Sequence, residues 1–110
     1  TMESVVKKIN EKIKEVKRKL TEDEKVILRN IDKRYRWIAR DGDGNLFIYR
    51  EKPIQIITKW VSSEALGFPS ELTAFSHLFQ FIKWEDKEPY LIEDLLKEEL
   101  PKNFEKLSEE

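Results

Sequence analysis

The sequence predicts an α+β domain, and three observations support this class. Apolar residues recur with a helical period over about the first 30 residues, alternate with polar residues from about residue 35, and return to a helical period near residue 90. The chain has 110 residues, which is the size of one domain with a single core. We expect an N-terminal helix or helix pair, a three- to four-stranded antiparallel sheet and a C-terminal acidic helix.

The first expected part is an amphipathic helix over residues 1–20. Its apolar positions are spaced alternately by four and three residues, as in the seam of a coiled coil. They are Met2, Val6, Ile9, Ile13, Val16 and Leu20. Lys12, Lys17 and Lys19 flank this seam, so a parallel homodimer would bring like charges together. We therefore expect a heterotypic or intramolecular partner and take these lysines as binding residues, with a homo-oligomer through residues 2–20 as the alternative.

The second expected part is a single α+β domain over residues 21–100, followed by a tail over residues 101–110. Thr21 and Glu24 match a capping box, so a second short helix should begin at Thr21. Its inward-facing residues should be Val26, Ile27 and Ile31.

Residues 35–50 predict a β-hairpin. The runs RYRWIAR and NLFIYR are rich in strand formers, and Asp43-Gly44 between them is preferred in a two-residue type I′ turn. That turn would pair Ala39 with Ile48 and would sort the side chains onto two faces. The core face would carry Tyr35, Trp37, Ala39, Leu46 and Ile48. The second face would carry Arg36, Ile38, Arg40, Phe47 and Tyr49.

The second face of this hairpin is a candidate binding surface. Aromatic rings at Phe47 and Tyr49 could stack on a flat ring while the guanidinium groups of Arg36 and Arg40 contact phosphate. The alternative is that a helix covers the aromatic rings and that the arginines pair with acidic residues.

The rest of the domain is expected to complete the sheet. Residues 54–61 predict a third strand, and residues 62–76 predict a loop with a helical turn from Ser70. Residues 77–86 fit a strand or a buried helix, and we favour a strand. A final helix should begin at about Tyr90, and its acidic residues make it the candidate intramolecular partner of the basic helix.

Residues 41–45 read D-x-D-x-N, which also opens a calcium-binding loop. Such a loop needs glycine at its sixth position and glutamate at its twelfth, where this chain has Leu46 and Lys52. We therefore expect a hairpin here and no metal. The sequence has no phosphate loop, nucleophile elbow or zinc motif, and its one imidazole, His77, has no assignable catalytic partner. We expect no catalytic residues, no cofactor and no enzyme activity.

Charge is unevenly distributed along the chain. Residues 1–40 hold 13 Lys/Arg against 7 Asp/Glu, and residues 41–110 hold 8 against 15, for a net charge of -1. The two halves could attract one another, or the basic half could meet an acidic partner. A net charge this low argues against duplex nucleic acid as a ligand. The absence of cysteine and of a long apolar run predicts a cytoplasmic protein without a membrane span.

Two stretches carry a resemblance, LTEDEKVILRNIDKRYRWIARDGDGNLFIYREKP and FSHLFQFIKWEDKEPYLIEDLL. They resemble short uncharacterised proteins of phages and prophages of Gram-positive bacteria, over roughly residues 20–97. The resemblance implies a small protein in the cytoplasm of a host bacterial cell that binds and inhibits a host macromolecule. The target class it suggests is an immune nuclease, as for anti-CRISPR proteins. The alternatives are a binder that sequesters a nucleotide signal and a structural or regulatory phage component that assembles through its heptad helix.

Overall fold

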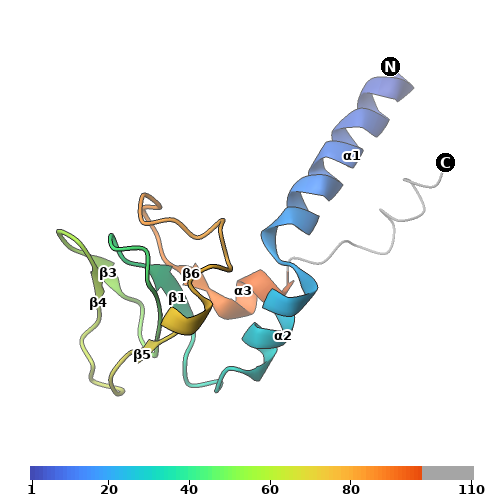
Figure 1. The fold of residues 1–110 in the computed structure, drawn as a ribbon. Helices are drawn as coiled ribbons and strands as arrows, with labels where there is room; N and C mark the ends of the chain where they lie inside the picture. The colour runs from blue at the N-terminus through green and yellow to red at the C-terminus, as the bar shows by residue number, and fades with distance from the viewer. Residues whose placement is uncertain (98–110) are drawn as a thin grey trace.

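The computed structural model describes residues 1–97, with the side chains of residues 11–19 outside the description. Within this range the fold is α+β, with three α-helices, a four-stranded antiparallel sheet and a separate two-stranded sheet (Figure 1). The elements in chain order are α1 (Met2–Lys19), α2 (Glu22–Asn30), β1 (Trp37–Arg40), β2 (Leu46–Tyr49), β3 (Ile54–Gln55), β4 (Trp60–Val61), β5 (Ser70–Glu71), the 3₁₀ helix η1 (Thr73–Phe75), β6 (Tyr90–Leu91) and α3 (Ile92–Lys97).

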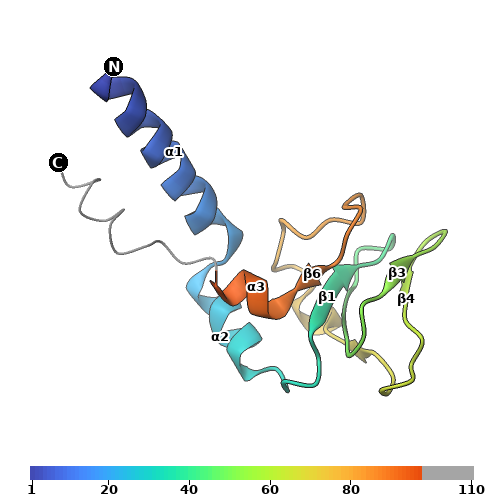
Figure 2. The same ribbon diagram turned by 180° about the vertical axis from the view of Figure 1, so that it is seen from behind.

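Helix α1 projects away from the rest of the molecule, as both ribbon views show (Figures 1 and 2). Its apolar residues Met2, Val5 and Val6 are exposed to solvent. The predicted binding residues Lys12, Lys17 and Lys19 have side chains outside the described set. Their role therefore stays a prediction. No helix in the described part of the chain is both long and apolar enough to cross a lipid bilayer.

Helix α2 begins at the predicted capping box. The Thr21 hydroxyl accepts the Glu24 N–H at 3.2 Å, and the Thr21 N–H donates to the Glu24 carboxylate at 2.9 Å. Leu28 is buried in the core and Ile27 packs against it, but Val26 is 51% exposed. The prediction that Val26 faces inward is wrong, because Glu24, Ile27 and Leu28 define the buried side of the helix.

The predicted hairpin is confirmed, but its predicted register is wrong by one residue. Ile38 pairs with Ile48 and Ala39 pairs with Phe47. The loop has three residues, 42–44, because Asp41 and Asn45 form the closing pair through the Asp41 N–H and the Asn45 carbonyl at 2.9 Å. A longer loop needs a left-handed residue at its end, and Gly44 supplies it with φ of +92°.

Two contacts from a distant part of the chain accompany the three-residue loop. The Gly42 N–H donates to the Thr58 carbonyl at 2.8 Å, and the Asp41 carboxylate accepts the Trp60 N–H at 2.9 Å. The Asp43 carboxylate accepts the Asn45 N–H at 3.0 Å. Both acidic side chains of the D-x-D-x-N run thus take part in fixing the turn.

The large sheet has the strand order β5-β2-β1-β6 and a core on each face. Helices α2 and α3 pack on one face, and the β3–β4 hairpin packs on the other (Figure 1). The larger core contains Leu20, Leu28, Ile38, Leu46, Ile48, Phe79, Ile82, Ile92 and Leu95. The smaller core contains Ala39, Tyr49 and Trp60, with Trp37, Phe47 and Trp84 packed against it. Both faces of the sheet are therefore covered, one by the helices and the other by the β3–β4 hairpin.

Two further strand predictions and the start of the final helix need correction. Residues 54–61 form a two-stranded hairpin, with Ile54 paired to Val61, where one continuous strand was expected. Residues 77–86 form turns and no strand, because Phe79 has φ of +55° and interrupts any extended run. The final helix begins after the short strand β6, which pairs with β1 through Ile38 and Tyr90. Two short strands, β5 and β6, complete the sheet in place of the predicted third and fourth strands.

Candidate functional site

The four hairpin residues predicted to form one binding surface lie on opposite faces of the sheet. In the observed register Arg36 and Arg40 are on the face of Ile38, whereas Phe47 and Tyr49 are on the face of Ala39. The combined surface of rings and guanidinium groups, on which nucleotide binding was predicted, is therefore not assembled.

The side chain of Arg40 binds the backbone of its own chain. Its guanidinium donates to five backbone carbonyls: Nε to Ile82 at 2.7 Å, Nη1 to Gly44 at 2.6 Å and Ser76 at 2.8 Å, and Nη2 to Leu78 at 2.9 Å and Phe79 at 3.1 Å. Burial lowers the pKa of this guanidinium. All five N–H donors of the side chain are engaged, so no donor remains for a ligand.

Phe47 and Tyr49 belong to the smaller core. Tyr49 is buried, and its hydroxyl donates to the Trp60 carbonyl at 3.3 Å. Burial raises the pKa of Tyr49, and the nearby carboxylate of Asp41 raises it further. The Trp60 indole donates to the Arg40 carbonyl at 3.1 Å and lies edge-on to Trp84, with ring centroids 6.4 Å apart. Arg36, by contrast, is exposed.

A different surface presents large apolar side chains to solvent. Ile57 is 93% exposed at the turn of the β3–β4 hairpin, and Phe68 and Leu66 are 73% and 61% exposed in the loop over residues 62–69. We define the apolar loop surface as Ile54, Ile56, Ile57, Leu66 and Phe68. The β3–β4 hairpin and the loop after β4 lie at the end of the molecule away from α1, with the hairpin turn and the loop at opposite ends of β4 (Figures 1 and 2). A contiguous exposed apolar patch typically marks a contact surface for another molecule, and we take these residues as the candidate surface.

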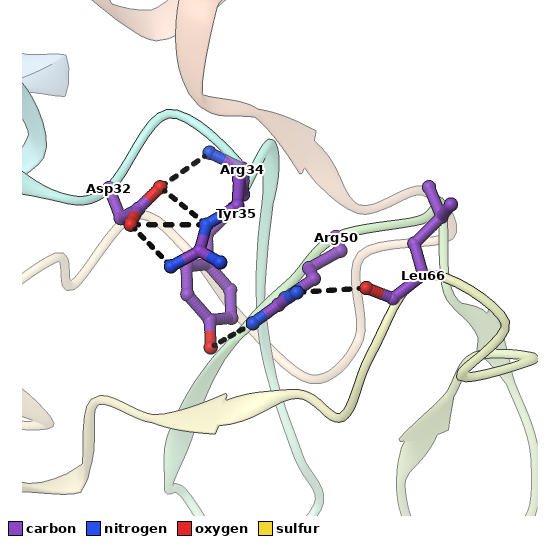
Figure 3. Close-up of polar contacts among 5 residues, drawn as sticks. All are labelled: Asp32, Arg34, Tyr35, Arg50 and Leu66. Atoms are coloured by element: carbon purple, nitrogen blue, oxygen red, sulfur yellow. Dashed lines mark hydrogen bonds and ion pairs between the residues drawn. The ribbon is translucent and has the colours of Figure 1, made fainter.

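Arg50 fixes the loop that carries Leu66 and Phe68 (Figure 3). Its Nη1 donates to the Leu66 carbonyl at 2.9 Å, and its guanidinium lies 5.0 Å from the centroid of the Tyr35 ring. Gly67 has φ of +126°, and a Cβ there would lie 2.7 Å from Arg50 Nη1. The guanidinium thus occupies the space of a side chain at position 67, and only glycine accommodates it.

Local hydrogen bonds give the same loop a defined backbone. The Ser63 hydroxyl donates to the Glu51 carboxylate, and the Gly67 N–H donates to the Glu64 carbonyl at 3.0 Å. Glu64 has φ of +60°, a conformation that is strained in a residue other than glycine. A depression of about 380 Å³ lies between this loop and the start of β3, where Ile54 and Ser63 contribute to its wall. Of the exposed apolar residues defined above, only Ile54 lines this depression.

The β3–β4 hairpin is also anchored. The Gln55 side chain donates to the Trp84 carbonyl at 2.7 Å, and the Ile56 N–H donates to the Lys59 carbonyl at 2.9 Å, which closes the turn around Ile57. The five apolar side chains carry no group that could transfer a proton or attack a bond.

The sequence contains a signal for this surface that periodicity alone did not identify. Ile56 and Ile57 are consecutive, which breaks the alternation of a half-buried strand and indicates a turn. Leu66 and Phe68 flank Gly67 in a segment of turn-forming residues, where large apolar groups have no core to enter.

An ion pair between Asp32 and Arg34 lies near Tyr35 and Arg50 (Figure 3). Arg34 donates from its side chain and its backbone to Asp32, with the shortest contact from Nη2 at 2.8 Å (Figure 3). These hydrogen bonds lower the pKa of Asp32 to about 2. The pair lies next to Tyr35 in the chain and keeps the segment that leads from α2 into β1 in a tight turn.

No protein-family model, curated protein or solved structure matches this chain. The structure defines an α+β domain with two apolar loops held in fixed conformations. Its function has to be inferred from these surfaces.

Proposed function

We propose that the protein is a non-enzymatic binding protein that inhibits a macromolecule by covering part of it with the apolar loop surface. The observation that carries this proposal is the exposure of five large apolar side chains on anchored loops, in a chain of which 39% is charged. A surface fixed before binding loses less conformational freedom in the complex, so more of the burial free energy appears as affinity.

The size of the effect is consistent with a protein partner. Full burial of one large apolar side chain contributes about 1.5–3 kcal/mol. Burial of Ile57 and Phe68 alone would contribute about 3–6 kcal/mol, which is below most of the range of about 4–15 kcal/mol that association costs. A stable complex therefore needs a partner that also covers the other residues of the apolar loop surface, and such a partner has the dimensions of a folded protein.

The biological setting of this proposal comes from the resemblance to phage and prophage proteins. In that setting the partner is a protein of the host bacterial cell, such as an immune nuclease, and the complex forms in the cytoplasm. Inhibition would then follow from occupying a surface that the nuclease needs, as an anti-defence protein does.

A second candidate function is supported by the exposed apolar residues Met2, Val5 and Val6 of α1. They fit a structural or regulatory phage component that assembles through this helix. Static light scattering distinguishes the two functions, because an assembly component is a dimer or larger and the Val6→Asp variant returns it to a monomer.

The main proposal is tested by affinity capture from a lysate of Gram-positive bacteria. We expect the wild-type chain to retain a host protein that the Ile57→Asp, Phe68→Asp double variant does not retain. Val26→Asp is the matched control, because it also replaces an exposed apolar residue by aspartate but lies on α2, away from the two loops.

The captured protein is then purified and its activity is measured with and without the chain. Inhibition by the wild type and by Val26→Asp, and none by the double variant, supports the proposal. Equal retention of the host protein by the double variant and the wild type would overturn it.

A further inference from the structure

A second surface of the molecule, distinct from the apolar loops, is a groove between α2 and α3. Its volume is about 420 Å³, which is within the range of sites that accept a ligand or a few side chains of a partner. The floor is aliphatic and includes Ile31, Ile92 and Leu96. Two helices and the segment that leads into β1 form its walls.

The rim of this groove is positively charged. Lys97 Nζ contacts Glu93 Oε1 at 2.7 Å, so these two charges balance each other. Lys33 and Arg36 also line the groove, and within the described part of the chain neither has an ion-pair partner within 4 Å. Lys97, and to a smaller degree Arg36, hold the pKa of Glu93 below its usual value. Among the described residues, three cations and one carboxylate therefore surround an apolar floor, which leaves the rim with an excess of positive charge.

The aliphatic floor and the positive rim together favour some classes of ligand over others. A nucleotide base needs hydrogen-bonding groups at its edge, and the floor offers aliphatic carbon, while the Tyr35 hydroxyl on the wall is already 3.5 Å from Arg50 Nη2. A groove walled by two helices suits an amphipathic helix, which inserts apolar side chains at i, i+3, i+4 and i+7. Lys33 and Arg36 favour acidic residues at the edges of that helix.

We propose that the groove between α2 and α3 binds an acidic amphipathic helix of a partner protein, with its apolar side chains on Ile31, Ile92 and Leu96 and its carboxylates against Lys33 and Arg36. This inference goes beyond the function proposed above, because it concerns a separate surface and stands without the apolar loops.

The test is fluorescence polarisation with a labelled synthetic helix, ELEELLEELE, whose leucines follow the required spacing. We expect saturable binding that weakens with added salt and is absent for the basic counterpart KLKKLLKKLK. The Lys33→Glu, Arg36→Glu variant should bind about tenfold or more weakly. The matched control, Lys83→Glu with Lys87→Glu, makes the same charge change at exposed residues outside the groove and should keep the wild-type affinity.

Several results would overturn the inference. They are equal binding of the acidic and basic helices, unchanged affinity in the Lys33→Glu, Arg36→Glu variant, or no binding at about 1 mM protein. A dimer in light scattering that Arg36→Glu dissolves would identify a second copy as the occupant instead.

Two further measurements separate these outcomes from folding defects and from the function proposed above. Amide chemical shifts of the wild type should change at Ile31, Ile92 and Leu96 on addition of the acidic helix, whatever the stability of the variants. The Ile57→Asp, Phe68→Asp variant should bind the acidic helix as the wild type does, since the apolar loops do not line the groove.

Discussion

Replacement of Arg40 by methionine is expected to lower the free energy of unfolding by about 3–5 kcal/mol. The methionine side chain keeps much of the apolar volume but removes every donor to the five carbonyls that the guanidinium contacts. A hydrogen bond to a charged group contributes about 1.5–3 kcal/mol when it is well buried. Arg40 is only partly buried, so we take about 1 kcal/mol for each contact and allow for water reaching some carbonyls.

The measurement is urea unfolding followed by tryptophan fluorescence, with the free energy obtained by linear extrapolation. Arg40→Lys should lie between the wild type and Arg40→Met, because an ammonium group has three donors where the guanidinium has five. The matched control is Arg34→Met, which removes an arginine that bonds an exposed carboxylate and should change the free energy of unfolding far less than Arg40→Met does. A loss below about 1 kcal/mol in Arg40→Met would refute the argument that this side chain organises residues 76–82.

Three other substitutions test the fold and the apolar loops. Gly67→Ala should lower the melting temperature by several degrees and weaken partner binding, because the new Cβ meets the guanidinium of Arg50 in a left-handed backbone. Glu24→Ala should cost about 1–2 kcal/mol in urea unfolding, since the carboxylate caps α2 and also accepts the Phe79 N–H. Tyr49→Phe should remove part of the alkaline loss of stability. The folded pKa of Tyr49 is raised, so its contribution is complete below about pH 10, the value for an unfolded tyrosine, and declines as pH rises above it. A pH series of unfolding free energies that has the same slope above pH 10 in both proteins would contradict this assignment.

Local sequence determined the features that depend on neighbours in the chain. The capping box at Thr21 and Glu24 requires residues three positions apart, and the hairpin requires a turn between two strand-forming runs. Both were predictable. The fold class followed from the same periodicities.

The register could not be predicted, because contacts distant in sequence accompany the longer turn. Asp43-Gly44 satisfies a two-residue turn, but Gly42 and Asp41 bind Thr58 and Trp60 once the loop has three residues. A shift of one residue in the pairing moves every side chain of one strand to the opposite face relative to its partner strand. For this reason Arg36 and Arg40 lie on one face of the sheet, and Phe47 and Tyr49 lie on the other.

The role of Arg40 was hidden for a similar reason. Four of its five acceptors lie in residues 76–82, a segment whose sequence suggests a strand but which has no ladder of its own. The donor and the acceptors are about 40 positions apart, as the separations of 36 to 42 residues show. Pattern analysis of a single chain has no access to such pairs.

The contact between Arg40 and the carbonyls has a consequence for sequence divergence. Backbone oxygens are the same whichever side chain a position carries, so most substitutions at Leu78 leave its hydrogen bond to Arg40 in place, whereas Ser76 also accepts the Leu46 N–H through its side chain at 3.1 Å. The residue at position 40 has no such freedom, because no other natural side chain offers five donors in one plane. Related sequences can therefore differ at the outer positions of residues 76–82, while the arginine at position 40 keeps the backbone of this segment in the same conformation.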